Sequence, residues 1–572
     1  MKKTSTLFFT SILSLIVSCA SAQSFGFQWA KQIAGPNNDM TMGITTDAAG
    51  NIYNCGNFDG TTDFDPGAGT FTMTSVTGGG GYASKLDANG NLVWAVAFPG
   101  QTLKTAVDAS GNVFVTGTFN GTQDFDPGSG TFTLTPASTN YPDMYVCKID
   151  NSGNFVFAGR IGGNDKETPT SMTADASGNI IITGLFKNTV DFDPMAATTY
   201  TMFSNGQDDG FVVKLDNSCN FLWGAKFGSS ASYEQTSDAA TDAAGNVYIT
   251  GAFAGNVDFD PSVMGYSGLS SPSSVNIYLL KLDAAGNFGW VNGFGSTSVN
   301  DESRAIALDA AGNIHIAGAY AGTVDFDPSA TATSTLTAVG GLDCFVAKYD
   351  ASGNYIFAKG FGSAAYDCCK DIKVSGNGTI CYTGVFFQNA DFDPSAAGTY
   401  TMASAGANDA FLAALDNTGN FLWAGNLSPW SYDAIEELAI TGTGDLYACG
   451  AFMFSTDFDP SSAVFNMSSS GFDGFILKLS GAGVGIKENN LNNAVSVYPN
   501  PFTNVITLSS EKINLQQADV IITDVTGRQI EKLSNLNSYN TQINLEQLKA
   551  GVYFYSIIEK NKTLATGKII KH

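Results

Sequence analysis

Two aspartates that flank one phenylalanine form the pattern in this sequence with the clearest potential for chemistry. The tetrapeptide Asp-Phe-Asp-Pro occurs seven times. Its carboxylates could help to hold Ca²⁺, which takes several oxygen ligands, or could cap a turn by accepting backbone N–H groups. The motif lacks the third acid and the glycine spacing of an established calcium loop, so we favour turn capping. The candidate Ca²⁺ ligands are Asp63, Asp65, Asp124, Asp126, Asp191, Asp193, Asp258, Asp260, Asp325, Asp327, Asp391, Asp393, Asp457 and Asp459.

A second set of acidic residues stands eight residues before a recurring turn. If the repeats are arranged radially, these residues form a ring near the mouth of a central channel. They could cap loop amides, or they could attract a metal ion or a cationic ligand. Gly100 takes the seventh place in the ring, and the acidic members are Asp39, Glu167, Glu234, Asp301, Asp367 and Asp433.

Signals for an enzyme are weak. The chain has two histidines, His315 inside an expected strand and His572 at the terminus, so neither a histidine-dependent triad nor a histidine-ligated metal is supported. Each carboxylate pair is repeated, whereas a catalytic pair should be unique. The loop 428–432 departs from the repeat and carries an aromatic pair, which could stack on a sugar, grip a protein or fill the loop's own small core.

Short strands separated by tight turns must position these residues. A turn of the type Asp-Ala-Ala-Gly-Asn precedes a strand such as 246–253, and a second such turn follows about 40 residues later in each repeat. Each repeat therefore has four antiparallel strands, as in a β-propeller blade. The chain starts with a lone fourth strand at 25–31 and ends the repeats at 480 without one. We therefore expect a seven-bladed β-propeller over 24–483 whose N-terminal strand completes the last blade.

The expected strand order also assigns the loops to two faces. Both tight turns of a blade lie on one face, and the long connections lie on the other, so a binding site is expected among the long connections. The third strand carries a lysine in six blades, with Ala414 as the exception. We expect these lysines to pair with repeat aspartates. They are Lys85, Lys148, Lys214, Lys281, Lys348 and Lys478.

The repeats resemble the bacterial seven-bladed β-propeller repeat family, whose units read Phe-Gly, then Asp-x-x-Gly-Asn-x-Tyr-x-Thr-Gly. The resemblance covers about residues 25–480. It implies the fold and little about function. The connection that contains Asp-Phe-Asp-Pro is longer here than in the family's unit.

Composition supports an exported all-β protein. Only 14% of the residues are charged, and the net charge is −25. An acidic surface repels nucleic acid and anionic lipid and attracts divalent cations or basic partners. Residues 1–22 read as a signal peptide, with lipidation of Cys19 as the alternative, and no later stretch is long and apolar enough for a transmembrane helix. Most of the cysteines are expected to be buried strand residues, although Cys55 and Cys449 share one repeat position.

The last part of the chain differs from the repeats. Residues 484–494 read as a linker, and 495–572 as a small Ig-like β-sandwich. The start Tyr-Pro-Asn-Pro, the turn Asp-Val-Thr-Gly-Arg, the strand Leu-x-x-Gly-Val-Tyr and the end Gly-Lys-Ile-Ile-Lys resemble the type A C-terminal sorting domain of the Bacteroidota type IX secretion system. This resemblance implies that 495–572 is read by that machinery.

Together these patterns predict a secreted or cell-surface β-propeller that acts as a binding or adhesion module. Its ligand would be a glycan or a protein, with Ca²⁺ as the candidate cofactor. Two alternatives remain. One is a secreted hydrolase or lyase that degrades polysaccharide at a unique site in one long loop. The other is a surface-layer or spacer protein.

Overall fold

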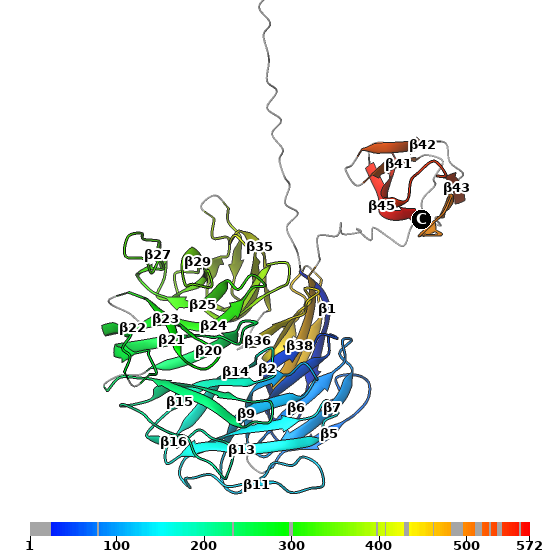
Figure 1. Ribbon diagram of the computed structural model, residues 1–572. Helices are drawn as coiled ribbons and strands as arrows, with labels where there is room; N and C mark the ends of the chain where they lie inside the picture. Colours follow the sequence, from blue (N-terminus) through cyan, green and yellow to red (C-terminus); the bar gives the residue numbers. More distant parts are fainter. Residues whose placement is uncertain are drawn as a thin grey trace, which may run out of the picture. The chain divides into compact units, whose positions relative to one another are not determined.

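The computed structural model describes residues 25–481 and 496–571 apart from short gaps, and these two stretches belong to separate compact units. The gaps are 77–78, 231–233, 263, 297–300, 396–397, 406–407, 428–433, 462, 510–517, 525–527, 535–539 and 560–561. In these described residues the regular structure consists of β-strands without a helix (Figure 1). A search of the same residues for an apolar helix of membrane-spanning length found none.

The first unit is built from repeated antiparallel sheets, which have four main strands each among the described residues. The first sheet contains β2 (Met40–Thr46), β3 (Ile52–Phe58), β6 (Gly80–Leu86) and β7 (Leu92–Phe98). The second contains β8 (Gln101–Val107), β9 (Val113–Phe119), β12 (Asp143–Ile149) and β13 (Phe155–Gly163). The third contains β14 (Glu167–Ala174), β15 (Ile180–Phe186), β18 (Asp209–Leu215) and β19 (Phe221–Phe227).

The remaining sheets of this unit follow the same order. The fourth contains β20 (Gln235–Thr241), β21 (Val247–Asp258), β22 (Gly268–Leu282) and β23 (Phe288–Phe294). The fifth contains β24 (Glu302–Leu308), β25 (Ile314–Tyr320), β28 (Asp343–Tyr349) and β29 (Tyr355–Phe361). The sixth contains β30 (Cys368–Val374), β31 (Ile380–Phe386), β34 (Asp409–Leu415) and β35 (Phe421–Leu427). The seventh contains β36 (Ala434–Ile440), β37 (Leu446–Asp457), β38 (Asn466–Gly481) and β1 (Phe25–Ile33).

The N-terminal strand completes the seventh sheet, as the sequence predicts. β1 runs antiparallel to β38, from the pair Phe25 and Gly481 to the pair Ile33 and Gly474. The first strands of successive sheets contact one another, and β36 of the seventh sheet contacts β2 of the first. The pairing of β1 covers the edge of β38 that would otherwise be open.

Each expected extra hairpin is present between the second and third strands. In the fourth and seventh sheets it is continuous with the main strands. In the other sheets it is formed by β4 (Thr61–Asp63) with β5 (Thr72–Thr74), β10 (Gln123–Asp124) with β11 (Thr133–Leu134), β16 (Thr189–Asp191) with β17 (Thr201–Phe203), β26 (Thr323–Asp325) with β27 (Thr335–Thr337), and β32 (Asn389–Asp391) with β33 (Thr401–Ala403).

The tight turns fold as their residues dictate. Asp47 Oδ1 accepts the N–H groups of Ala49 and Asn51, both at 2.9 Å, and Oδ2 accepts the Asn51 side-chain amide at 2.8 Å. Gly50 takes a φ of 80°, which a residue with a Cβ adopts only with strain. The turn is therefore specified by its aspartate and its glycine.

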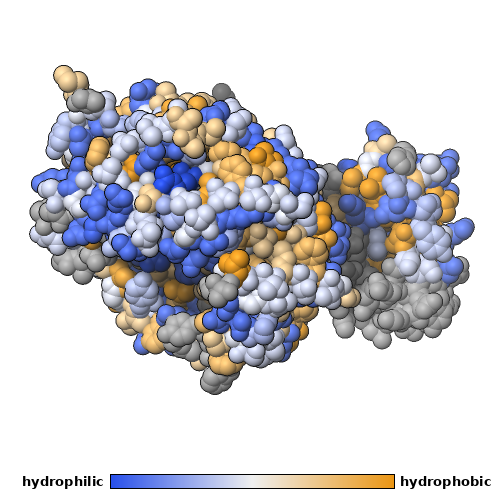
Figure 2. Space-filling model, turned by 90° about the horizontal axis from the view of Figure 1, so that it is seen from below, coloured by the Kyte–Doolittle hydropathy of each residue, from blue (hydrophilic) through white to orange (hydrophobic). Residues whose placement is uncertain are grey.

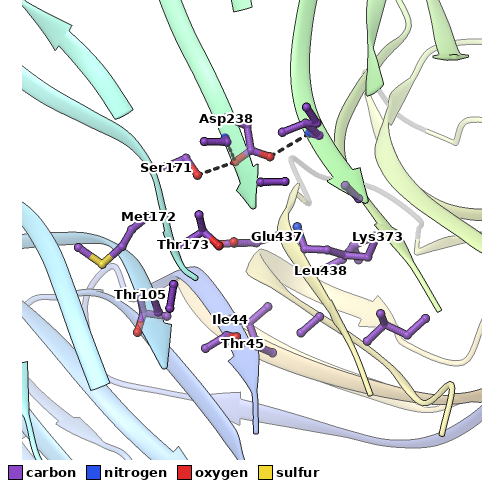
Figure 3. Close-up of a pocket in the computed structure, with 18 of the residues that line it drawn as sticks. Ile44, Thr45, Thr105, Ser171, Met172, Thr173, Asp238, Lys373, Glu437 and Leu438 are labelled. Carbon is purple, nitrogen blue, oxygen red and sulfur yellow. Dashed lines mark hydrogen bonds between the residues drawn. The ribbon is translucent and has the colours of Figure 1, made fainter. Parts of the chain in front are cut away.

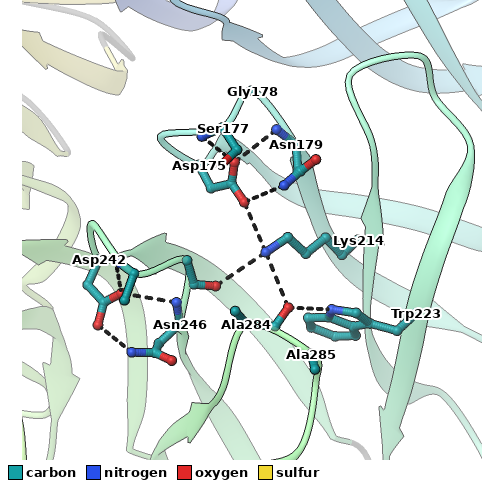
Figure 4. Close-up of polar contacts among 12 residues, drawn as sticks. Asp175, Ser177, Gly178, Asn179, Lys214, Trp223, Asp242, Asn246, Ala284 and Ala285 are labelled. Carbon is teal, nitrogen blue, oxygen red and sulfur yellow. Dashed lines mark hydrogen bonds and ion pairs between the residues drawn. The ribbon is translucent and has the colours of Figure 1, made fainter.

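The repeated lysine joins each sheet to the next. Lys214 lies 2.9 Å from Asp175 Oδ2 in its own sheet, and it donates to the carbonyls of Gly245 and Ala284 in the fourth sheet (Figure 4). The Trp223 indole N–H donates to the same Ala284 carbonyl at 3.1 Å. The other lysines reach the equivalent residue of the next sheet's second turn, namely Lys85 to Asn151, Lys148 to Asn217, Lys281 to Ala351, Lys348 to Asn417 and Lys478 to Ala88.

The order of the strands explains why the sixth sheet has no such lysine. Ala414 occupies the position there. The fourth strand of the seventh sheet is β1, which arrives from the N-terminus, so this sheet lacks the turn that a lysine at 414 would reach. Conversely, Lys478 of the seventh sheet donates to Ala88 of the first sheet at 3.3 Å.

The described residues of the second unit form two antiparallel sheets that share one apolar core, which includes Ile506, Val520, Ile557 and Ile569. One sheet is formed by β39 (Ser496–Tyr498), β40 (Val505–Ser509) and β43 (Asn540–Asn544). The other is formed by β42 (Gln529–Leu533), β41 (Asp519–Asp524), β44 (Gly551–Glu559) and β45 (Lys562–Lys571).

The cysteines of the described residues are all buried and free, including Cys55 and Cys449. Burial raises the pKa of the Cys449 thiol well above its ordinary value. These side chains therefore act as small apolar residues of the sheets.

Candidate functional site

The carboxylates of the Asp-Phe-Asp-Pro motif cap their own hairpin. Asp63 Oδ1 accepts the N–H of Asp65 at 3.0 Å and that of Phe71 at 2.8 Å, and Asp65 Oδ1 accepts the N–H of Gly67 at 2.8 Å. The same bonds recur in the other copies. Among the described residues no group of three or more His, Cys, Asp or Glu side chains is arranged to hold a metal. Binding of Ca²⁺ by these aspartates stays a prediction.

The phenylalanine of the motif anchors the hairpin to the sheet. Phe326 is fully buried, with its ring centroid 4.9 Å from that of Phe345 and 5.9 Å from that of Tyr320. An equivalent aromatic cluster surrounds Phe64, Phe125, Phe192, Phe259, Phe392 and Phe458. The aromatic ring therefore fixes the hairpin while the two carboxylates shape its turn.

The predicted acidic ring is buried where successive sheets meet. Asp301 Oδ2 accepts the N–H of Ser296 at 2.6 Å, and Oδ1 accepts that of Ala321 at 2.8 Å, so its carboxylate caps loop amides. The structure does not describe Asp433. The five described members are almost fully buried, namely Asp39, Glu167, Glu234, Asp301 and Asp367.

Sequence reasoning missed a second set of buried acids that faces this ring. They stand at one position at the start of the third strand, and the repeat phase itself was the signal that could have found them. Asn276 and Gly80 take this position in the fourth and first sheets. The acidic members are Asp143, Asp209, Asp343, Asp409 and Asp473.

The two buried sets form carboxyl pairs across the sheet junctions. Burial and the nearby charge of Asp143 raise the pKa of Glu167 to about 9. At the junction with the seventh sheet, burial raises the pKa of Asp39 to about 7, with a smaller contribution from Asp473. Where the ring has Gly100, the facing position is Gly80, so both acids are replaced together.

The first strands of all the sheets line a central hollow of about 420 Å³ (Figure 3). A bulge interrupts the pairing of each first strand with its second strand. A bulge locally redirects a strand and its side chains. The residues that directly follow the bulge in the seven sheets are of six types, and those of the third, fourth and seventh sheets line the hollow. They are Gly43, Lys104, Ser171, Asp238, Ala305, Asp371 and Glu437.

Charged side chains from distant sheets meet in the hollow. Lys104 Nζ of the second sheet lies 3.5 Å from Glu437 Oε2 of the seventh sheet, although the first sheet comes between these two sheets. A Cβ at Gly43 would lie 2.8 Å from Cys55 Sγ and 3.4 Å from this Glu437 oxygen, so the glycine sits closely against both groups. Lys373 Nζ contacts both oxygens of Asp371, at 2.7 and 2.9 Å.

Neutral donors hold the third carboxylate of the hollow. Asp238 Oδ1 accepts the Ser171 hydroxyl at 2.5 Å, and Oδ2 accepts the Ile306 N–H at 3.0 Å. Burial raises the pKa of Asp238 and that of Glu437 above their ordinary values. Burial lowers the pKa of Lys104, but the charge of Glu437 and of further carboxylates outweighs it, so the net shift is upward. The hollow thus offers hydrogen-bonding and charged groups of both signs.

The predicted loop site and the outer surface offer few further candidate groups for binding a ligand. The loop 428–432 lies outside the described residues. In the loop 164–168 of the third sheet, Asp165 accepts the side-chain amide of Asn188 at 2.8 Å. Figure 2 shows hydrophilic residues interspersed with small apolar patches on the surface of the repeat unit.

Comparison with known proteins assigns the C-terminal part of the chain. Residues 496–572 match the family of secretion system C-terminal sorting domains. The chain is also similar to an uncharacterised WD repeat-containing protein of Acanthamoeba polyphaga mimivirus, with 23% identity over 529 residues. That alignment covers 79% of this chain and 38% of the relative, so the chain spans well under half of the relative's length.

Among solved structures, a biofilm-associated protein described as a BSP domain matches over 96% of both chains with 10% identity and a TM-score of 0.12. The sorting domain indicates that the protein interacts with the secretion machinery and is delivered to the cell surface or released outside the cell.

Proposed function

We propose that the repeat unit is a closed seven-bladed β-propeller that works outside the cell as a binding module. The pairing of β1 with β38, the contact of β36 with β2 and the bond from Lys478 to Ala88 support closure of the ring. The similarity to a WD repeat-containing protein supports a repeat-built binding surface. A closed ring has no open sheet edge, which suits a protein that is exposed outside the cell.

The central hollow is the proposed ligand site. One observation carries this proposal: the seven first strands bring side chains of unlike chemistry to one hollow, among them Ser171, Asp238, Lys373 and Glu437. A residue that stabilises every sheet in the same way is expected to repeat. A single ligand in the central hollow would instead contact each sheet with a different part of its surface, so the residues that bind it are expected to differ. The volume of the hollow, about 420 Å³, is in the usual range of pockets for small molecules.

The export route completes the proposal. Residues 1–22 act as the signal peptide, 484–494 as the linker, and 495–572 as an Ig-like domain that the type IX machinery of a Bacteroidota cell recognises. The match of 496–572 to a sorting-domain family supports this assignment. The repeat unit is then the part that acts after export.

A thermal-shift screen tests the binding function. The chain is screened against amino acids, polyamines, and mono- and disaccharides, in the wild type and in Thr173→Trp, which places a large ring in the hollow. We expect at least one compound to raise the melting temperature of the wild type and to lose at least about tenfold in affinity in the variant.

The matched control is Thr133→Trp, at an exposed strand position away from the hollow. This variant should bind as the wild type does. Equal binding by Thr173→Trp and the wild type would reject the hollow as the site. Release of a chemically altered product would instead favour the hydrolase or lyase alternative.

A further inference from the structure

Two smaller hollows recur at one place in the repeat, away from the central hollow. In the second sheet, a hollow of about 300 Å³ lies between the turn at Asp126 and Pro127 and the turn that ends at Asn154 and Phe155. In the fifth sheet, a hollow of about 350 Å³ has the same repeat positions in its lining, namely Asp327, Pro328, Asn354 and Tyr355.

We propose that each of these two hollows binds one ring of a neutral saccharide. Each hollow brings together an aromatic ring, a carboxylate, a side-chain amide and a serine hydroxyl. The apolar C–H face of a sugar packs on an aromatic ring, while its hydroxyls need hydrogen-bonding groups at the edge of the ring.

Both aromatic rings are held in place before a ligand arrives. The Phe155 ring packs against Phe132, with centroids 5.2 Å apart. The Tyr355 hydroxyl is hydrogen-bonded to the Ser334 hydroxyl at 2.5 Å and accepts the N–H of Ala358 at 2.9 Å. An aromatic ring that is already held in place loses little conformational entropy when a ligand binds, which favours the binding of a weak ligand.

The carboxylate in each hollow has capacity to accept a sugar hydroxyl. Asp126 Oδ1 accepts the Gly128 N–H at 2.8 Å, and among the described residues Oδ2 accepts no hydrogen bond. Gly130 makes room for this oxygen, because a Cβ there would lie 2.1 Å from it. Asp327 Oδ1 likewise accepts the Ser329 N–H at 2.9 Å.

The charge of the lining selects against acidic sugars. The described residues that line the two hollows include a carboxylate in each, but neither Lys nor Arg. An anionic sugar would therefore meet like charge without a compensating cation. Two sites on one chain also allow multivalent binding to a glycan-coated surface, which can raise avidity by roughly 10²- to 10⁴-fold over a single site.

Saturation-transfer NMR with methyl glycosides of glucose, galactose, mannose and N-acetylglucosamine at millimolar concentration tests this inference. We expect transfer from protein to the ring protons of at least one glycoside. The double variant Asp126→Asn and Asp327→Asn keeps the side-chain oxygen that accepts the turn N–H, and it should lose more than half of the signal. Phe155→Leu should also lower the signal, because it removes one aromatic wall.

The first sheet supplies the matched control. Asp65 accepts the Gly67 N–H in the same way, but Leu92 occupies the position of Phe155 in the second sheet and Tyr355 in the fifth. Asp65→Asn should therefore leave the signal unchanged. The inference fails if no glycoside shows transfer, if the double variant keeps the full signal, or if Asp65→Asn lowers the signal as much. None of these outcomes bears on the central hollow, which the Thr173→Trp screen tests.

Discussion

Two positions of the same repeat, one on its third strand and one on its first, contrast sharply. On the third strand, lysine occupies six of seven equivalent places, and each lysine reaches the same turn of the next sheet. On the first strand, the seven residues after the bulge are of six types, and those of the third, fourth and seventh sheets line the central hollow. Repetition thus marks residues that hold sheet to sheet, and divergence marks the place where one ligand would contact unlike neighbours.

One exception within the repeated lysine set supports this distinction, because it has a structural cause. Ala414 faces no turn, since the last strand of the seventh sheet comes from the N-terminus. Gly80 and Gly100 replace both members of one buried acid pair together. The differences around the hollow have no such local cause, which is why we assign them to binding.

The largest effect is expected from a repeated aromatic residue. Phe326→Ala removes a fully buried ring from its aromatic cluster and should lower the free energy of unfolding by about 3–5 kcal/mol, because a cavity remains. Urea denaturation of the variant measures this. A loss below about 1 kcal/mol would mean that the motif does not anchor its sheet.

A slightly smaller loss is expected when one lysine link is broken. Lys214→Met leaves the Asp175 carboxylate and two turn carbonyls without their buried cation, at a cost of about 3 kcal/mol. The matched change Ala414→Lys should add no stability, because no equivalent turn is available to it. Stabilisation by Ala414→Lys would contradict our explanation of the exception.

The buried acid pairs make stability depend on pH. The pKa of Glu167 is raised from 4.5 to about 9, so the folded chain holds this proton more tightly than the unfolded chain. Its contribution is complete below about pH 4.5 and is lost as the pH rises toward 9. Glu167→Gln should therefore flatten the fall in melting temperature between pH 6 and 9.

The control for this pH effect is Asp59→Asn, which changes an exposed acid of the same unit. It should leave the pH dependence as in the wild type. If Glu167→Gln melts with the same pH dependence as the wild type, the carboxyl pair does not hold a proton in the folded state.

The smallest effect is expected from removal of divalent cations. Because each first aspartate of the motif accepts two backbone N–H groups, EDTA should leave the melting temperature unchanged. A clear drop on EDTA addition, reversed by Ca²⁺, would favour the calcium hypothesis for Asp-Phe-Asp-Pro.

Much of the fold could be predicted because it repeats. The turn aspartates, the strand order and the N-terminal strand follow from phase and residue type. The pairing of the lysines with repeat aspartates is confirmed in part: Lys214 contacts Asp175 and Lys348 contacts Asp309, whereas Lys85 and Lys148 bond Asn151 and Asn217 of the next sheet. The third-strand acids such as Asp143 are also in phase, but they are single residues outside any longer motif, and Gly80 and Asn276 interrupt the series.

The central hollow could not be predicted in the same way. Its residues do not repeat, and a bulge decides which side chains face inward. Contacts such as Lys104 with Glu437 join residues far apart in the sequence across an intervening sheet. Pattern analysis directed the search to the long loops, whereas the unlike residues lie on the first strands.

Thermal shift of two variants with a compound found in the screen tests the central claim most directly. Glu437→Gln changes the hollow, and Lys214→Met changes a repeated link. We predict that Glu437→Gln melts within a few degrees of the wild type and loses at least about tenfold in affinity. Lys214→Met should melt much lower and, below its melting temperature, bind with unchanged affinity. Wild-type binding by Glu437→Gln together with lost binding by folded Lys214→Met would contradict the account.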